Sequence, residues 1–326
     1  MIHARITGTG SYAPKKVITN HDLEKLVDTS DEWIIERTGI KERRIAEKGQ
    51  CTSDLAFEAG KKALKAAGLD AQELDLILVA TTTPDMLMPN LGCMLQEKLG
   101  AKKAAAFDIY AACSGFIYGL SVADAFIRAE TYKNILLVGA ESLSRFVDWE
   151  DRTTCVLFGD GAGAVVLQRQ SGKRGVLSTH LHSDGSLGSL LNIPGGGALH
   201  PATHDTVRKR MHFIKMKGNE TFKAAVRSLE DVVQEALERN KVKPEDIDFL
   251  VPHQANLRII QAMAQRLKMP MDKVVLTLPK YGNTSAASIP MALDEAVRDG
   301  RIKENHLLLL EAFGGGLTWA SALVRW

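Results

Sequence analysis

The 326-residue sequence has few cysteines, almost no net charge and no long apolar segment. Its four cysteines form no CxxC pair and are too few for a secreted disulfide scaffold. Lys and Arg number 41 against 39 Asp and Glu, so the formal net charge of +2 creates no field that would attract nucleic acid or an anionic membrane. No stretch reads as a signal peptide or a membrane span. These absences predict a cytoplasmic protein with reduced thiols that binds neither nucleic acid nor membrane.

The composition that is present, 45% hydrophobic and 25% charged, is typical of a globular protein with a large core. The runs LDLILVA, NILLVGA and GAGAVVL are continuously apolar, as strands buried on both faces must be. Stretches with helical periodicity alternate with them. The pattern therefore predicts a layered α/β fold in which helices cover mixed or parallel sheets.

Two parts of the chain resemble each other. ELDLILVATTT resembles EDIDFLVPHQAN, where Asp75 matches Asp248 at a spacing of 173 residues, and the same spacing relates NILLVGAES to HLLLLEAFGGG. We therefore expect two structural halves, residues 1–168 and 169–326, which meet at the polar stretch QSGKRG. Each half should contain helix, strand, helix, strand, buried helix and strand, in that order.

Cys113 is the candidate nucleophile. It lies in DIYAACSGFIYGLSVADAFIRA, where small and apolar residues on every face predict a buried helix with Cys113 in its first turn. A helix N-terminus carries partial positive charge, so we expect this thiol to ionise readily. A small core cysteine is the alternative, and we assign that role to the other three, Cys51, Cys93 and Cys155.

His253 is the candidate catalytic histidine, because it follows a buried strand and precedes an amphipathic helix in DFLVPHQANLRII. Ligands collect at the carboxyl ends of strands in such sheets. His180 and His182 have the spacing of a metal pair, but no cysteine or paired acidic ligand lies near them in the sequence. We therefore predict no metal site.

Asn283 precedes a second small-residue helix in PKYGNTSAASIPMAL, and the repeat spacing places it beside the Cys113 region. A structural helix cap is the alternative for this asparagine. The glycines Gly314, Gly315 and Gly316 follow a buried strand, where a flexible backbone could turn an N–H toward a ligand and form an oxyanion hole. FGDGAGAVVL lacks GxGxxG spacing and a following helix, so a dinucleotide site is not expected.

AACSGF, HQAN, YGNTSAAS and the terminal FGGG together resemble the β-ketoacyl-acyl-carrier-protein synthase III branch of the thiolase-like condensing enzymes. The order and spacing of all four motifs match, and the similarity runs from Ile6 to Trp326. The resemblance implies a five-layer αβαβα sandwich of two duplicated halves, and a homodimer as the active form.

The resemblance also implies a decarboxylative condensation of an acyl-CoA primer with malonyl-acyl carrier protein, which initiates type II fatty acid biosynthesis. Cys113 would take the acyl group, while His253 and Asn283 would stabilise the enolate that forms when carbon dioxide leaves. Backbone N–H groups of Cys113 and Gly315 would form the oxyanion hole. Coenzyme A enters as a substrate thioester, and no cofactor is implied.

Further residues match binding positions of the family. The coenzyme A contacts would be Thr29, Trp33, Arg37, Arg152, Gly218 and Asn256. The acidic carrier protein would dock on Lys223, Arg258 and Arg266, although one basic position of the family is Gln265 here. TTTPDMLMPN resembles a loop that crosses the dimer interface, and the acyl pocket would include Met88 and Phe313.

Four alternatives remain open at this point. One is a polyketide starter synthase of the same fold, and another is a thiolase-like acyltransferase, although thiolases use a second cysteine near the C-terminus and none follows Cys155. A third is a noncatalytic acyl-CoA-binding protein. The last is a hydrolase with a papain-like triad of Cys113, His253 and Asn283.

Overall fold

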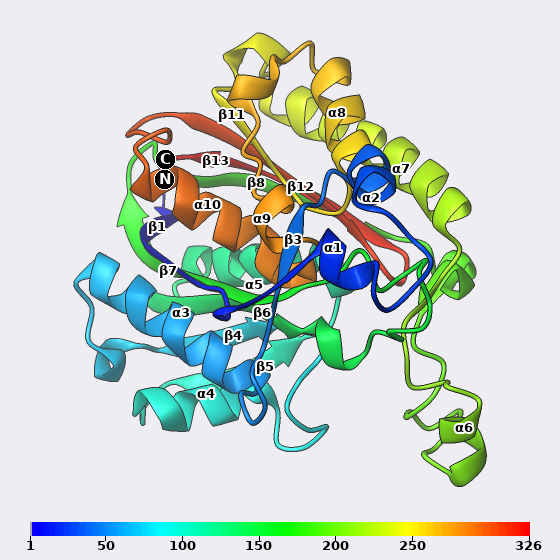
Figure 1. Ribbon diagram of the computed structural model, residues 1–326. Coiled ribbons are helices and arrows are strands. Elements are labelled where there is room, and N and C mark those ends of the chain that lie inside the picture. The colour runs from blue at the N-terminus through cyan, green and yellow to red at the C-terminus, as the bar shows by residue number, and fades with distance from the viewer. Residues whose placement is uncertain (1) are drawn as a thin grey trace.

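The computed structural model describes residues 2–326 and contains two large sheets that lie one above the other (Figure 1). The five-stranded sheet has the order β1-β7-β6-β4-β5 and the four-stranded sheet the order β11-β12-β13-β8. In both sheets parallel and antiparallel neighbours are mixed. The strands are β1 (Ile2–Tyr12), β4 (Leu76–Ala80), β5 (Ala105–Ile109), β6 (Asn134–Ser142), β7 (Asp160–Ser171), β8 (Gly175–Ser183), β11 (Phe249–Pro252), β12 (Leu307–Gly314) and β13 (Thr318–Arg325).

The helices form three layers around the two sheets. α5 (Gly115–Arg128) and α10 (Ser288–Arg298) lie between the sheets and share one apolar core with strands of both. α3 (Thr52–Ala67) and α4 (Leu91–Leu99) cover the outer face of the first sheet, and α7 (Gly218–Asn240) and α8 (Leu257–Arg266) that of the second (Figure 1). The five-layer αβαβα sandwich implied by the family resemblance is confirmed. Within residues 2–326 no helix is long and apolar enough to cross a membrane.

Shorter elements connect these layers. Figure 1 shows α6 extending away from the body of the protein, while α2 packs against α8 and α1 lies next to α2. The shorter elements are β2 (Lys16–Thr19), α1 (Asn20–Leu23), α2 (Asp31–Thr38), β3 (Glu42–Ile45), β9 (Leu191–Asn192), α6 (His204–Arg208), β10 (Lys215–Met216) and α9 (Leu278–Tyr281). The 3₁₀ turns are η1 (Ala71–Glu73), η2 (Ala112–Ser114), η3 (Leu143–Arg145), η4 (Gly185–Leu190), η5 (Pro244–Asp246), η6 (Met271–Lys273) and η7 (Ser285–Ala287).

The internal repeat is visible in the hydrogen bonds of its matched residues. Asp75 Oδ2 accepts a bond from the backbone N–H of Asn134 at 2.8 Å, where β6 begins. Asp248 Oδ2 accepts the equivalent bond from the N–H of Leu307 at 2.7 Å, where β12 begins. The two carboxylates therefore hold corresponding strands in the two halves. The division after Gln168 stays a prediction.

The predicted order of six elements is wrong in the second half. A strand was expected between α8 and α10, but Val274 makes one isolated bridge to Leu250, and the chain then forms α9. Pro279 in the first turn of α9 favours the start of a helix and cannot donate a ladder hydrogen bond. Two further strands, β1 and β8, were not predicted; they pair antiparallel with β7 and β13 at the matching places of the two sheets.

Glycines in β6 and β7 allow the second half to approach the first sheet. A Cβ on Gly139 would lie 2.2 Å from the carbonyl oxygen of Ala286, and one on Gly163 would lie 2.5 Å from the backbone nitrogen of Met291. Real Cβ atoms do not come this close to backbone atoms, so a larger residue would push η7 and α10 away. These two contacts position the segment that carries the second group of candidate residues.

Candidate active site

Cys113 lies in η2, immediately before α5, and is 7% exposed. The predicted buried helix is present, but Cys113 lies in the 3₁₀ turn that precedes it and not in its first α-helical turn. Cys113 lines a cavity of about 440 Å³ whose wall is largely apolar. The lining residues are Thr82, Tyr110, Ala111, Ala112, Cys113, Leu143, Phe158, Gly188, Leu191, Asn192, Ile193, Ile214, Ser285, Gly315, Gly316 and Thr318.

The expectation that the Cys113 thiol ionises readily is wrong for this structure. Burial, with a smaller contribution from the Glu141 carboxylate, raises the pKa of Cys113 to about 12. Hydrogen bonds from Ser285 and from the backbone of Cys113 act in the opposite direction but are the weaker influence. The partial charge of a helix N-terminus does not offset the loss of solvation, so the thiol is neutral before substrate binds.

Asn283 precedes η7, which is the counterpart of η2 in the second half. The turns pack together, because a Cβ on Gly115 would lie 3.5 Å from the Cβ of Ala286. The Oδ1 atom of Asn283 accepts the backbone N–H of Ser285 at 2.8 Å. The asparagine thus acts in part as the structural cap that was the alternative for it, but its side-chain N–H groups remain available to a ligand.

His253 is buried directly after β11, and its hydrogen bonds fix which ring nitrogen carries the proton. Its Nδ1 lies 2.6 Å from the Ser288 hydroxyl oxygen, which also accepts the backbone N–H of Gln254 at 3.3 Å. Within the described residues the Ser288 hydroxyl has no other acceptor for its own proton, so we assign this proton to the bond with Nδ1 of His253. The proton of the neutral ring is then on Nε2, which makes Nε2–H a donor.

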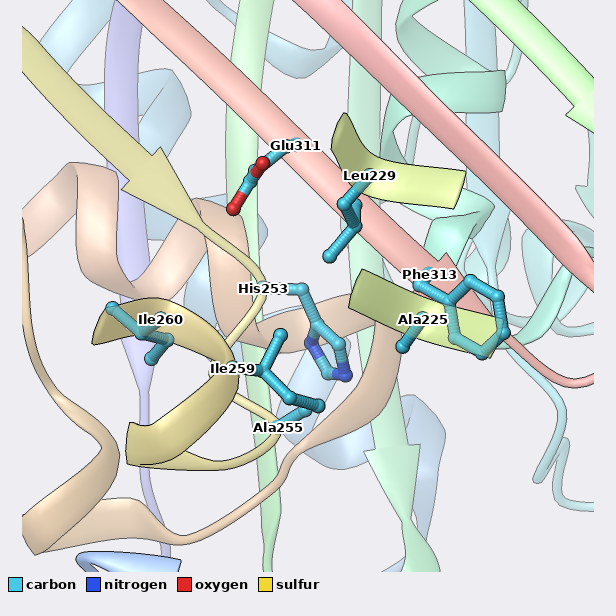
Figure 2. A pocket seen from close by; sticks show the side chains of 8 residues that line it. All are labelled: Ala225, Leu229, His253, Ala255, Ile259, Ile260, Glu311 and Phe313. Carbon is cyan, nitrogen blue, oxygen red and sulfur yellow. The ribbon is translucent and has the colours of Figure 1, made fainter. Parts of the chain in front are cut away.

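Burial lowers the pKa of His253 from 6.5 to about 3, so the ring is neutral at physiological pH. Figure 2 shows the ring between α7 and α8, close to Ile259 and Phe313. These residues and Glu311 line a cavity of about 20 Å³, separate from the larger cavity at Cys113. His253 lies at the carboxyl end of β11, where its backbone N–H is bonded to the carbonyl oxygen of Glu311 in β12.

Glu311 is a buried carboxyl group in β12 that the sequence analysis did not identify. Its Oε2 has no hydrogen-bond partner within the described part of the chain, and burial raises its pKa to about 8. The group is therefore mostly protonated at pH 7. A charged residue inside the apolar run HLLLLEAF is the sequence signal that could have revealed it.

The terminal glycines approach the nucleophile from β12. A Cβ on Gly314 would lie 2.6 Å from the backbone nitrogen of Cys113, so no larger residue fits there. Gly315 and Gly316 line the same cavity as Cys113. The glycine run therefore places backbone groups next to the thiol, as an oxyanion hole requires.

The structure brings together four of the predicted coenzyme A contacts. The guanidinium carbons of Arg152 and Arg37 lie 5.0 and 5.3 Å from the centre of the Trp33 ring. Arg152 also donates to the backbone oxygen of Asp28 at 2.6 Å, next to Thr29. The buried Oγ1 of Thr29 lacks a hydrogen-bond partner among residues 2–326. An aromatic face, two cations and an unused hydroxyl are suited to a phosphorylated nucleotide.

Asn256 and Gly218 occupy structural positions near this cluster. Asn256 caps α8 through the backbone N–H of Arg258 at 2.9 Å, and its Nδ2 donates to the carbonyl oxygen of Arg37 at 2.9 Å. Gly218 begins α7, where little surrounds it. The side chain of Asn256 thus links the α2 end to α8, and its contact with pantetheine stays a prediction.

The predicted docking residues lie on the exposed faces of α7 and α8, which pack against each other. The Arg258 guanidinium carbon lies 5.5 Å from the centre of the Phe222 ring, so Arg258 contacts the first turns of α7, the segment that also contains Lys223. Arg266 is paired with Glu230 at 2.5 Å, so part of its charge is already neutralised. Lys223 and Arg258 are the stronger candidates for an acidic partner.

The two predicted acyl-pocket residues do not line the cavity at Cys113 within this chain. Met88 is 86% exposed on the loop between β4 and α4, and Phe313 lies in the small cavity with His253. The roles of both residues stay predictions.

The prediction that Cys51, Cys93 and Cys155 are core cysteines is wrong for Cys93, which is exposed, and for Cys51, which is half-buried. Cys155 is buried, and all four thiols are free.

His180 and His182 flank a glutamate on α7. Nδ1 of His180 lies 3.4 Å from Glu235, and Nε2 of His182 lies 2.6 Å from the other oxygen of the same carboxylate. In the described chain, no group of three or more His, Cys, Asp or Glu residues has the arrangement of a metal site. The contacts of the two rings with Glu235 link β8 to α7.

Known proteins with a similar sequence show the family to which this set of candidate residues belongs. Residues 107–185 match the family model "3-Oxoacyl-[acyl-carrier-protein (ACP)] synthase III", and residues 237–326 match the model of its C-terminal part. The chain is 58% identical over 327 residues to a β-ketoacyl-[acyl-carrier-protein] synthase III of Alkalilimnicola ehrlichii, and the match covers 100% of both chains.

Solved structures show the same similarity. The 3-oxoacyl-[acyl-carrier-protein] synthase III of Aquifex aeolicus superposes with a TM-score of 0.92 at 53% identity, covering 99% of this chain and 100% of the other. The priming β-ketosynthase of the R1128 polyketide pathway also gives a TM-score of 0.92, at 33% identity, covering 99% of this chain and 96% of the other.

Proposed function

The chain belongs to the β-ketoacyl-acyl-carrier-protein synthase III family, and from this premise we propose how its residues perform the reaction of that family. The enzyme condenses an acyl-CoA with malonyl-acyl carrier protein to give a β-ketoacyl-acyl carrier protein, the first step of fatty acid synthesis. The observation that carries the assignment of roles is the meeting of η2 and η7, which brings Cys113 and Asn283 to one place.

In the first half-reaction, the Cys113 sulfur attacks the acyl-CoA carbonyl carbon and coenzyme A leaves as the thiol. Backbone N–H groups of Cys113 and Gly315 hold the oxyanion of the tetrahedral intermediate. The apolar cavity at Cys113 receives the acyl chain. A buried, neutral thiol is suited to this arrangement because the proton need leave only when the substrate is in place.

In the second half-reaction, malonyl thioester loses carbon dioxide and the enolate attacks the acyl-enzyme. The Nε2–H of His253 and the Nδ2–H of Asn283 donate to the thioester oxygen, where negative charge develops. A histidine with a pKa of about 3 remains a neutral donor across the physiological range. Donors of this kind supply the stabilisation that the enolate needs, so we propose no metal and no cofactor beyond the thioester itself.

Coenzyme A is proposed to bind at Trp33, Arg37 and Arg152, where adenine stacks and phosphate meets guanidinium. Arg152 and Trp33 already contact each other, so a base that inserts between them must displace the guanidinium. The unused Oγ1 of Thr29 would gain a hydrogen bond in the process. Malonyl-acyl carrier protein is proposed to dock on the exposed α7–α8 face at Lys223 and Arg258, with Arg266 at its edge.

A homodimer is proposed because the first sheet ends in an exposed edge. β5 is the edge strand. Phe107 in its middle and Tyr110 just after it are exposed, as are Met86, Leu87 and Met88 on the loop between β4 and α4. Unpaired edges and apolar patches of this kind are normally covered by a partner. Pairing through β5 would bring Met88 to the partner's acyl cavity. A cytoplasmic location is proposed because the nucleophilic thiol must stay reduced.

The decisive experiment separates condensation from hydrolysis. Purified protein is incubated with acyl-CoA and malonyl-acyl carrier protein, and the products are identified by mass spectrometry. The proposal predicts a β-ketoacyl-acyl carrier protein two carbons longer than the primer, together with free coenzyme A and carbon dioxide. Release of free fatty acid without a new carbon–carbon bond would instead support the papain-like hydrolase.

A further inference from the structure

Arg43 is a buried arginine that the reaction described so far does not use. It lies in β3 and is fully buried. Its Nη2 donates to the backbone oxygen of Val156 at 2.8 Å. Its Nη1 donates to Oδ1 of Asn20 at 2.9 Å and to the backbone oxygen of Ile18 at 3.2 Å. The guanidinium group therefore joins the start of α1 to the segment that contains Val156.

Burial of this cation is costly, because its hydrogen-bond partners are three neutral oxygens. Its Nε has no partner within the described part of the chain. Burial lowers the pKa of Arg43 to about 10, so the group still carries its charge at neutral pH. A guanidinium group presents several donors in one rigid plane, so it can hold the two segments in one fixed arrangement.

The segment held by Arg43 fixes the backbone of Asn283. The backbone N–H of Asn283 donates to the oxygen of Leu157 at 2.9 Å, and the backbone oxygen of Asn283 accepts the N–H of Gly159 at 3.0 Å. These two bonds form an isolated parallel β-bridge. Val156 directly precedes this bridge, so its bond to Arg43 holds one side of the bridge in place.

The stem of the Arg43 side chain also lies next to both sides of the bridge. A Cβ on Gly159 would lie 3.2 Å from the Cβ of Arg43, and a Cβ on Gly282 would lie 3.4 Å from it. Gly282 precedes Asn283 and has φ +64°, a conformation that favours glycine. Figure 1 shows β3 beside α9, the helix that leads into this turn. Arg43 therefore supports the Asn283 turn directly as well as through Val156.

We propose that Arg43 is a positioning residue that holds Asn283 where its Nδ2–H can donate to the malonyl thioester oxygen. This inference deepens the proposed function and rests on it. Oδ1 of Asn283 is already bonded to the backbone N–H of Ser285, so the direction of Nδ2–H follows from the position of the backbone. Misplacement of a catalytic group by about 1 Å can lower a rate by about 100-fold. Arg43 acts on the reaction through Asn283 alone.

The test measures the two half-reactions separately in Arg43→Met, which keeps an unbranched stem and removes every donor. Acyl transfer at saturating acyl-CoA is followed by rapid quench and intact mass. Carbon dioxide release is measured in a single turnover, after long incubation has acylated the protein and malonyl-acyl carrier protein is added. We expect carbon dioxide release to fall by about 10- to 100-fold.

Acylation in Arg43→Met should stay within about threefold of wild type, because the bonds of Arg43 do not reach the nucleophile. Cys113 is held in η2, which packs against β12 and η7. Equal loss of both half-reactions would therefore overturn the proposal, since it would indicate general damage to the fold.

A double-mutant cycle distinguishes positioning of Asn283 from general support of the fold. In Asn283→Ala the donor is already absent, so adding Arg43→Met should lower carbon dioxide release by less than about threefold further. A residue that merely stabilises the fold would lower the rate by the same factor in both backgrounds. A full effect of Arg43→Met in the Asn283→Ala background would thus contradict the proposal.

Arg43→Lys is the second variant, and it keeps the test decisive if Arg43→Met does not fold. A lysine keeps the charge but lacks the rigid fork of donors, so carbon dioxide release should fall by about three- to tenfold. Arg169→Met, near the end of β7 where Arg169 is bonded to Glu130 at 3.0 Å, is the matched control and should keep both rates.

The outcomes separate failure of the inference from failure of the proposed function. Carbon dioxide release at the wild-type rate in the Arg43 variants would overturn the positioning role and leave the proposed function intact. If the acylated wild-type protein releases no carbon dioxide from malonyl-acyl carrier protein, the proposed function fails and the role of Arg43 fails with it.

Discussion

Replacing His253 by alanine should separate the two half-reactions. The ring is buried and neutral, and its bond to Ser288 directs Nε2–H toward a ligand. His253 is not among the causes that shift the pKa of Cys113, which are burial of the thiol and the nearby Ser285 and Glu141. The variant therefore loses a donor to the enolate while the thiol keeps its surroundings.

The expected magnitude follows from the loss of one preorganised donor. Such a donor contributes about 3 to 4 kcal/mol to a transition state, so carbon dioxide release should fall by about 100- to 1,000-fold. Acylation from acyl-CoA should change by less than about tenfold. Because the pKa of His253 is about 3, this residue should add no inflection to the wild-type decarboxylation profile between pH 5 and 8.

The assay measures acyl-enzyme by intact mass and labelled carbon dioxide release in the same preparation. His306→Ala, at a turn before β12, is the matched control and should leave both rates unchanged. Asn283→Ala is a less clean test, because Oδ1 of Asn283 also accepts the backbone N–H of Ser285, and its loss would disturb the turn η7 that packs against η2. If His253→Ala cannot be acylated but still decarboxylates malonyl-acyl carrier protein, the histidine is the activating base and the reasoning is refuted.

Three further predictions concern stability and docking. Folding raises the pKa of Glu311 from 4.5 to about 8, so between these pH values the folded state keeps a proton that the unfolded state loses. The free energy of unfolding should therefore fall as the pH rises from 4.5 to 8, by at most about 1.4 kcal/mol per pH unit. Thermal melts of Glu311→Gln should lack this component. Gly139→Ala should lower the free energy of unfolding, measured by urea titration, by about 1 to 3 kcal/mol, because the added Cβ would clash with the carbonyl oxygen of Ala286. The control Gly185→Ala, where the added Cβ meets no atom, should change it by less than about 0.5 kcal/mol. Arg258→Glu should raise the KM for malonyl-acyl carrier protein and weaken its salt dependence, with acylation from acyl-CoA unchanged; equal loss of both would indicate damage to the fold.

The sequence was informative where a residue type has one physical role. Continuous apolar runs identified β4, β6 and β7, and the matched residues Asp75 and Asp248 indicated the duplication that the structure shows in their hydrogen bonds. The missing strand in the second half could not be foreseen from periodicity. Val274 makes only one isolated bridge, to Leu250, and Pro279 then favours the start of the helix α9.

The candidate site was only partly predictable. Cys113, His253 and Asn283 stand in motifs, but the neutral states of the thiol and the imidazole depend on burial by segments distant in the chain. Burial dominates the charge of a helix end, and no local pattern reports its extent. Glu141 and Glu311 did leave a signal, since each is an acidic residue within an apolar strand, where an unpaired charge is costly.

The central claim is that Cys113 alone carries the acyl group, and peptide mapping tests it most directly. The protein is incubated with acyl-CoA in the absence of malonyl substrate, digested under conditions that preserve thioesters, and analysed by tandem mass spectrometry. The account predicts a single stoichiometric acyl label on the peptide that contains Cys113, and no label in Cys113→Ser. An acyl group on Cys51, Cys93 or Cys155, or normal condensation by Cys113→Ser, would contradict it.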